Sequence, residues 1–184
     1  MTNHLRHAPE LQVSRWFNTE RNLKLEDLRG KLTIIHAFQM LCPGCVTHAL
    51  PQMLRLHQTF SSDEVNLIGL HTVFEHHAAM NPEALAAFIY EYQLPFPIGV
   101  DAPHPNHRIP QTMQELGLQG TPSLVILDRE NRIRGHQFGR LDDLSLGLII
   151  GRLLAEEGYQ EESERGRQQE ESSHKGCDTD ACPA

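Results

Sequence analysis

Two spacings of hydrophobic residues alternate along the chain. Near-continuous apolar runs predict strands that are buried on both faces, and they lie at Leu32–Phe38, Val65–Leu70, Phe96–Val100 and Ser123–Leu127. Between these runs, apolar residues recur every three to four positions, which predicts helices over residues 43–60, 81–92 and 109–116. Asn81 and Pro82 suit the first positions of the second helix, and Gly117 suits the end of the third.

Shorter elements complete the pattern at both ends of this region. Leu11–Trp16 is expected to form an N-terminal strand, and Leu25–Leu28 a helical turn that ends at Gly30. A turn at residues 128–131 leads into Ile133–Phe138, which is expected to pair back as a hairpin before a last helix over Leu141–Ala155. Strands that alternate with helices, followed by a hairpin, predict a three-layer α/β/α sandwich with a mixed central sheet and a central strand-helix insert.

Composition divides the chain into two parts. The 184 residues carry a formal charge of −8, and the segment 156–184 contains nine acidic and three basic residues, so it holds most of that charge. This segment has few apolar residues to bury, which predicts an acidic, disordered tail behind a domain over residues 1–155. The negative charge argues against nucleic acid or an anionic membrane surface as a partner.

The lengths of the apolar stretches and the number of cysteines bear on the cellular compartment. No apolar stretch approaches the roughly 18 residues that span a bilayer, and the first ten residues lack the apolar run of a secretory signal. A cytoplasmic location is therefore expected, or a periplasmic one if the start has been trimmed. Four cysteines in 184 residues are too few for a disulfide framework.

The motif that carries chemistry is Cys42-Pro43-Gly44-Cys45, which follows the first buried strand and opens a helix. Pro43 suits the first helical position, so Cys42 is the expected N-cap. Its sulfur would face free backbone N–H groups and the positive end of the helix dipole, which predicts a lowered pKa for the Cys42 thiol. Cys45 follows one turn later, less exposed, on the same side of the helix.

This pair predicts dithiol–disulfide exchange without a cofactor. Cys42 would attack a substrate disulfide, and Cys45 would then attack Cys42 and release the reduced substrate. A zinc site is an alternative, but only His48 lies near as a further ligand, so such a site would be incomplete. Attachment of c-type haem requires a histidine directly after the second cysteine, where this chain has Val46.

A second signal, Gly120-Thr121-Pro122, precedes the fourth buried strand. The order strand–CPGC–helix, insert, Thr-Pro–strand, hairpin and helix resembles thioredoxin-fold proteins, and within them the TlpA-like or redoxin (AhpC/TSA-related) branch. The resemblance covers about residues 9–155. It implies a thioredoxin-like fold in which Cys42 is the nucleophile, Cys45 the resolving thiol and Pro122 a cis-proline beside them.

The resemblance also implies roles for residues around the two cysteines. The Thr121 backbone would pair with an extended substrate, and Pro43 and Gly44 would contact that substrate. Glu75, in the loop after the second buried strand, matches the position of an acid that accepts a proton in TlpA-like proteins, so it is a candidate base for Cys45. The expected partner is a disulfide- or dithiol-containing protein, with a thioredoxin- or glutathione-type electron donor.

Three departures from the family pattern bear on function. Leu41 stands where many relatives have tryptophan. Pro51 lies six residues after Cys45, where five is usual, which predicts a bulge in the helix. The peroxiredoxin motif Pro-x-x-x-Thr-x-x-Cys is absent, since Ile35 and Gln39 occupy its proline and threonine positions. This absence makes a thiol-dependent peroxidase of the AhpC/TSA type the alternative function and not the first one. A Cys/His metal-binding redox module is a further alternative.

The tail contains two further cysteines, Cys177 and Cys182. A flexible tether of this length reaches across a small domain, so these cysteines are candidates for a second redox pair that exchanges electrons with the CPGC motif. Weak binding of a soft metal together with His174, or two idle thiols, are the alternatives. No bound metal is predicted for the domain itself.

Overall fold

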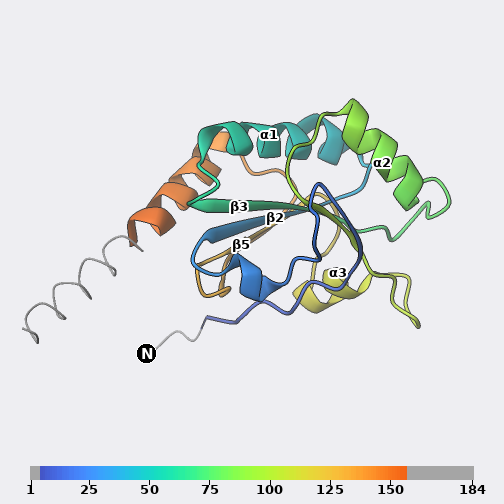
Figure 1. The fold of residues 1–184 in the computed structure, drawn as a ribbon, viewed down its shortest axis with the longest axis horizontal. Helices are drawn as coiled ribbons and strands as arrows, with labels where there is room; N and C mark the ends of the chain where they lie inside the picture. The colour runs from blue at the N-terminus through green and yellow to red at the C-terminus, as the bar shows by residue number, and fades with distance from the viewer. Residues whose placement is uncertain (1–4, 157–184) are drawn as a thin grey trace, which may run out of the picture. The chain divides into compact units, whose positions relative to one another are not determined.

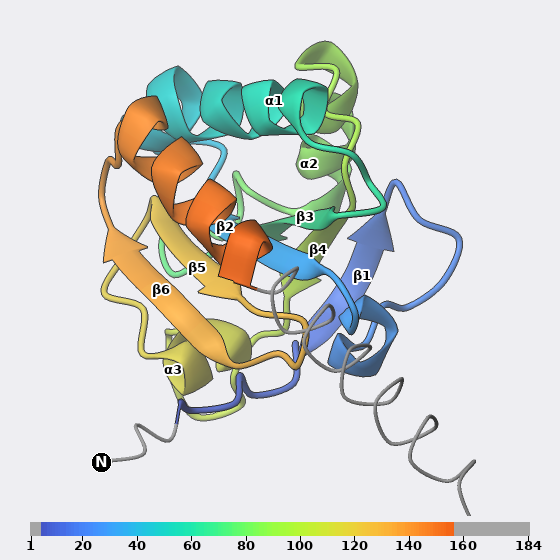
Figure 2. The ribbon, with the colours of Figure 1, turned by 90° about the vertical axis from the view of Figure 1, so that its left-hand side faces the viewer.

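The computed structural model describes residues 5–156. Within that range the chain forms one six-stranded sheet in the order β1-β4-β3-β2-β5-β6 (Figures 1 and 2). The strands are β1 (Val13–Phe17), β2 (Leu32–Phe38), β3 (Val65–His71), β4 (Ile98–Asp101), β5 (Ser123–Leu127) and β6 (Ile133–Phe138). The tail cysteines Cys177 and Cys182 lie outside the described residues.

Helices connect the strands on both faces of the sheet. They are a 3₁₀ turn η1 (Leu25–Leu28), a π-helical segment η2 (Cys45–Ala49), α1 (Leu50–Thr59), α2 (Pro82–Glu91) and α3 (Gln111–Leu116). Both views show α1 and α2 on one face of the sheet and α3 on the other. The chain divides into two units, Met1–Asp143 and Leu144–Ala184, and all these elements belong to the first. Residues 143–156 are helical.

Strand directions make the sheet mixed, as predicted. β3 runs parallel to β2 and to β4, whereas β1, β5 and β6 are antiparallel to their neighbours. The carboxyl ends of the three parallel strands therefore lie at one edge of the sheet. The CPGC motif follows β2 directly at this edge, so the sheet fixes the position of the dithiol.

The near-continuous apolar strands bury side chains on both faces. On one face Ile35 and Val125 pack with Met113 of α3 and with the leucines of η1. On the other face Phe38 lies 6.5 Å from Phe88 of α2, measured between ring centroids. All seven residues of β2 are buried, which explains the absence of the alternating polar positions of a half-exposed strand.

Element boundaries differ from the predictions at several places, two of which have a clear cause in the sequence. The third predicted strand starts at Ile98 rather than at residue 96, and the third predicted helix starts at Gln111 rather than at residue 109. Prolines explain both shifts, since Pro97 cannot donate to a strand ladder and Pro110 caps the helix from an extended conformation. Asn81 caps α2 as predicted, because its Oδ1 accepts from the Ala84 amide at 2.9 Å.

The last predicted helix, Leu141–Ala155, begins two residues later and is observed over residues 143–156. Among the described residues, none of the helices is long and apolar enough to cross a lipid bilayer.

Candidate active site

Cys42 caps the helix that carries the dithiol. Residues 43 and 44 are helical, and the Cys45 amide donates to the Cys42 Sγ at 3.3 Å. This contact is the N-cap interaction predicted from the sequence, with sulfur in place of the usual oxygen acceptor. Cys42 is half-buried and, like Cys45, carries a free thiol. The Cys42 sulfur is therefore held in place and only partly buried.

The predicted bulge lies directly after the motif. Residues Cys45–Ala49 form a π-helical turn in which the Leu50 amide donates to the Cys45 carbonyl, five residues back. Pro51 explains the turn, because it has no N–H to donate and its ring would clash with the carbonyl four residues before it in a regular α-helix. A π turn accommodates one additional residue without changing the face that the helix presents on either side.

Cys45 lies in a very different environment from Cys42, since none of it is exposed to solvent. Burial, and to a smaller extent a hydrogen bond with the Cys42 side chain, raise the pKa of the Cys45 thiol from 9.0 to about 12. Two groups act in the opposite direction: the backbone of Gln39 and the hydroxyl of Thr121 hydrogen-bond to the sulfur and lower its pKa. The thiol is therefore the strongly favoured form of Cys45.

Thr121 and Pro122 complete the site from the other half of the domain. The bond between them is cis, as the family resemblance implied. The Cys42 thiol donates to the Thr121 carbonyl at 3.5 Å. A Cβ added to Gly44 would lie 3.4 Å from Pro122 Cδ, so the helix and the proline are in close contact. Five of the predicted site residues are thus brought together.

Gln39 is a site residue that sequence reasoning did not identify. Its Nε2 donates to the Thr121 hydroxyl at 3.4 Å, and its Oε1 is buried with no hydrogen-bond partner. Gln39 therefore orients the hydroxyl that contacts Cys45. The signal was present in the sequence, because a glutamine inside the apolar run from residue 32 to residue 40 requires a polar partner.

Glu75, the predicted base, is not brought into contact with the dithiol. It lies in the loop after β3 and is exposed, and within residues 5–156 it makes no hydrogen bond or ion pair with either cysteine. Its role as a base stays a prediction. Pro43, predicted to contact substrate, is exposed at the start of the helix.

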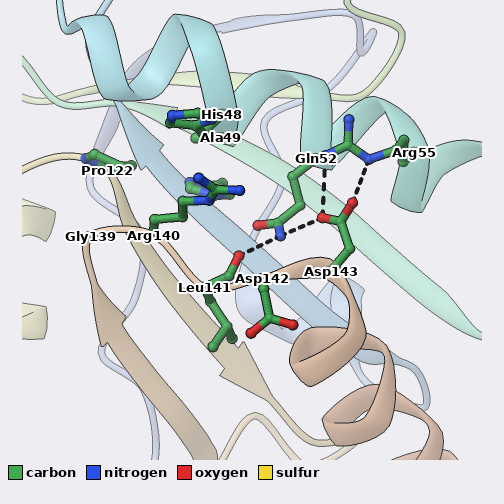
Figure 3. Close-up of a pocket in the computed structure, with 11 residues that line it drawn as sticks. His48, Ala49, Gln52, Arg55, Pro122, Gly139, Arg140, Leu141, Asp142 and Asp143 are labelled. Carbon is green, nitrogen blue, oxygen red and sulfur yellow. Dashed lines mark hydrogen bonds and ion pairs between the residues drawn. The ribbon is translucent and has the colours of Figure 1, made fainter.

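A cavity of about 100 Å³ lies beside Pro122, the cis-proline of the site. One wall is the active-site helix with His48 and Gln52, and the opposite wall is the segment 139–143 after β6 (Figure 3). His36 of β2 also lines the cavity; it is 3% exposed, and its Nδ1 has no hydrogen-bond partner. Burial lowers the pKa of His36 from 6.5 to about 4.

Two large apolar side chains are exposed next to the site. Leu41, directly before Cys42, is 57% exposed, and Phe138, at the end of β6, is 49% exposed. The Phe138 ring lies over Gly120, since a Cβ at Gly120 would be 2.9 Å from the ring. Among residues 5–156, no group of three or more potential ligands (His, Cys, Asp or Glu) is arranged to hold a metal ion.

A half-buried thiol at a helix N-cap, a buried thiol one turn behind it and a cis-proline beside both define a thioredoxin-fold dithiol protein. The family model described as AhpC/TSA matches residues 5–136, and the chain therefore belongs to the AhpC/TSA family.

Solved structures agree with this assignment. The chain is similar to a thiol-disulfide isomerase from Corynebacterium glutamicum, with 49% identity, a TM-score of 0.79 and coverage of 83% of this chain and 97% of that one. It is equally similar to a thioredoxin-like superfamily protein, with 49% identity, a TM-score of 0.79 and coverage of 80% and 96%. The fold is therefore that of thiol-disulfide oxidoreductases.

A curated relative is much longer. Human NHL repeat-containing protein 2 is 30% identical over 115 residues, which are 61% of this chain and 15% of that protein. The chain thus spans about 15% of the length of the curated relatives it matches.

Proposed function

We propose that this protein is a thiol-disulfide oxidoreductase that exchanges a disulfide with a partner protein through Cys42 and Cys45. The observation that carries the proposal is the asymmetry of the two thiols. Cys42 is half-buried at a helix N-cap, whereas Cys45 is fully buried with a pKa raised to about 12. The Cys42 sulfur is accessible to an external disulfide, whereas the buried Cys45 sulfur is accessible only to Cys42.

The first step forms a mixed disulfide. The Cys42 thiolate attacks one sulfur of the substrate disulfide, an S–S bond forms to that sulfur, and the other substrate sulfur leaves as a thiolate that takes a proton from solvent. The Cys45 amide, which donates to the Cys42 sulfur at 3.3 Å, stabilises the negative charge on Cys42 before the attack.

The second step releases the substrate. Cys45 loses its proton to a solvent base and attacks the Cys42 sulfur, so the mixed disulfide breaks and a Cys42–Cys45 disulfide forms. The Thr121 hydroxyl and the Gln39 backbone stabilise the transient Cys45 thiolate. Two electrons have then passed from the dithiol to the substrate, and a thioredoxin- or glutathione-type dithiol or thiol restores the reduced protein.

Serine variants test this order of events. In full-length protein with Cys177 and Cys182 replaced by serine, Cys42→Ser is expected to abolish reduction of a model disulfide. The matched variant Cys45→Ser is expected to stop after the first step and to accumulate one mixed disulfide per chain, detected by intact mass. Undiminished reduction by Cys42→Ser would contradict the proposal.

The direction of exchange is tested by the equilibrium reduction potential in glutathione buffers. A value near −270 mV, like that of thioredoxin, would mean a reductase, and a value near −120 mV would mean a disulfide donor. The exposed Leu41 and Phe138 beside the dithiol support a protein as the partner, because exposed apolar side chains of this size are typical of interaction surfaces.

Peroxide reduction is the second candidate, because the AhpC/TSA family model covers this site. Reduced protein would then be oxidised by a hydroperoxide much faster than a free thiol is. Consumption at the rate of a free thiol would exclude the peroxidase activity without affecting the exchange proposal.

A further inference from the structure

The cavity beside Pro122 contains a cationic side chain that the exchange chemistry does not use. Figure 3 shows Arg140 extending into this cavity below His48, and no dashed line joins it to another residue. Arg140 is exposed, and among residues 5–156 no carboxylate lies within ion-pair distance of its guanidinium. Its N–H donors are therefore available to a ligand.

The neighbouring acidic groups leave this charge uncompensated at close range. Asp143 is held by Arg55 at 2.8 Å and by Gln52 at 2.8 Å, and it acts on Arg140 only through a longer-range attraction. The Asp142 carboxylate points away from the Arg140 guanidinium in Figure 3. The side of the cavity nearest to Pro122 is consequently electropositive.

The backbone fixes Arg140 beside the dithiol. The Gly139 amide donates to the Pro122 carbonyl at 2.8 Å, which attaches the segment with Arg140 to the cis-proline. One residue before that proline, the Thr121 carbonyl accepts from the Cys42 thiol at 3.5 Å. Arg140 is thus attached, through Gly139 and Pro122, to the segment that contacts Cys42, so a group that it binds can belong to the substrate that Cys42 attacks.

The size and lining of the cavity limit the ligand to one functional group. Its volume of about 100 Å³ is well below the ~300–1,000 Å³ of pockets that enclose a whole small molecule. His36, which is 3% exposed with an unpartnered Nδ1, supplies a second polar group in the lining. A guanidinium fork with a polar group nearby matches a carboxylate better than any neutral group.

The geometry points to a subsite, formed by Arg140 with His48 and His36, that binds a carboxylate of the disulfide substrate. The preferred substrates would be disulfides with a carboxylate close to the reacting sulfur, as in an acidic peptide or in glutathione disulfide. This inference rests on the proposed function and names the class of substrate that the dithiol selects.

The test compares disulfides that differ in charge. Prereduced full-length protein carrying Cys177→Ser and Cys182→Ser is mixed with glutathione disulfide, with neutral bis(2-hydroxyethyl) disulfide or with cationic cystamine. The second-order rate constant for oxidation of the protein is measured by acid quench and mass spectrometry. Arg140→Gln is expected to lower the rate constant for glutathione disulfide about tenfold, as for loss of one charge-assisted hydrogen bond, and to leave the neutral disulfide unchanged.

Three controls make the result specific. Arg140→Lys is expected to restore part of the rate, and added salt is expected to reduce the wild-type preference for glutathione disulfide. Arg29→Gln removes the same charge from an exposed residue before β2, at the opposite end of the strand from the dithiol, and is expected to change nothing.

The outcomes separate the two proposals. Equal loss with charged and neutral disulfides, or no loss with either glutathione disulfide or an acidic cysteine-containing peptide disulfide, would overturn the carboxylate subsite while exchange itself still occurs. If the wild-type protein is oxidised by none of the disulfides, the proposed function fails instead. A slower reaction of Arg140→Gln with an acidic cysteine-containing peptide disulfide, but not with glutathione disulfide, would assign the subsite to peptides.

Discussion

Replacing Thr121 by valine removes one hydroxyl group from the dithiol site and leaves the rest of the residue in place. The valine keeps the β-branched shape and the backbone carbonyl that accepts from Cys42 at 3.5 Å. What is lost is the hydroxyl that lowers the pKa of Cys45 and accepts from Gln39 at 3.4 Å. The change therefore acts on the second chemical step and spares the first.

The magnitude follows from the state of Cys45. A thiol pKa of about 12 instead of 9.0 means that forming its thiolate costs about 4 kcal/mol more than for an ordinary cysteine. A hydrogen bond to a charged group contributes about 1.5–3 kcal/mol, so its loss slows a step through the Cys45 thiolate roughly tenfold to hundredfold. The Gln39 amide also loses its partner, which destabilises the fold by about 1–3 kcal/mol.

A chromogenic nitrobenzoate disulfide resolves the two steps. Attack by Cys42 releases one coloured thiolate, and the attack of Cys45 on the mixed disulfide releases the second. For Thr121→Val, measured in the Cys177→Ser, Cys182→Ser background, the first phase is expected to be unchanged and the second slowed. The wild-type second phase is expected to accelerate with pH without reaching a plateau below about pH 10, because the pKa of Cys45 is raised.

The matched control is Thr59→Val, which also removes a hydroxyl hydrogen bond, from the Thr59 hydroxyl to the Arg55 carbonyl at 2.7 Å, at an exposed position at the far end of α1. This variant is expected to leave both phases unchanged. The reasoning is refuted if Thr121→Val slows both phases equally, since that result indicates a general distortion, or if it slows neither.

Three further results are expected. Burial lowers the pKa values of His36 and His71 from 6.5 to about 4, so the unfolded state takes up protons before the folded state as the pH falls. Urea denaturation should therefore show about 2 kcal/mol of stability lost per histidine between pH 7 and pH 5. His71→Leu should remove about half of the combined loss. Gly69→Ala should lower the free energy of unfolding by about 1–3 kcal/mol, because its Cβ would approach a β4 side chain to 3.0 Å, whereas Gly147→Ala, with nothing within 4 Å, should not. Deletion of Thr47 removes one residue from the π turn and should restore an α-helical turn, visible in a crystal structure, while both nitrobenzoate phases are preserved. Loss of the second phase would show instead that the π turn positions Cys45.

Local sequence signals were sufficient for most of the fold. β2 and β5 have the predicted bounds, because their apolar runs end at polar or turn-forming residues. The N-cap role of Cys42 could be predicted because proline at the first helical position defines which residue precedes the helix. Pro51 predicted the bulge in the same way, since a proline in a helix interior constrains the turn before it.

Contacts between distant segments were not accessible to such reasoning. Gln39 and Thr121 are 82 positions apart, and nothing in either neighbourhood indicates that their side chains meet. The cavity depends on Gly139 reaching Pro122 across the β5–β6 hairpin, so the place of Arg140 follows from the strand pairing and not from a motif. The role of Glu75 was inferred from a family pattern and stays a prediction; its side chain is exposed, and within residues 5–156 it makes no hydrogen bond or ion pair with either cysteine.

The geometry of thiol exchange connects these distant contacts to substrate choice. Cys45 reaches the Cys42 sulfur from the buried side, so the leaving sulfur of a mixed disulfide has to lie on the solvent side of Cys42 for the three sulfurs to align. That side is bordered by the Thr121 carbonyl, and the Pro122 that follows forms part of the wall of the Arg140 cavity. If Arg140 binds substrate as we propose, a substrate aligned for release passes its flanking groups over the cavity, where a carboxylate gains an interaction that a neutral group does not.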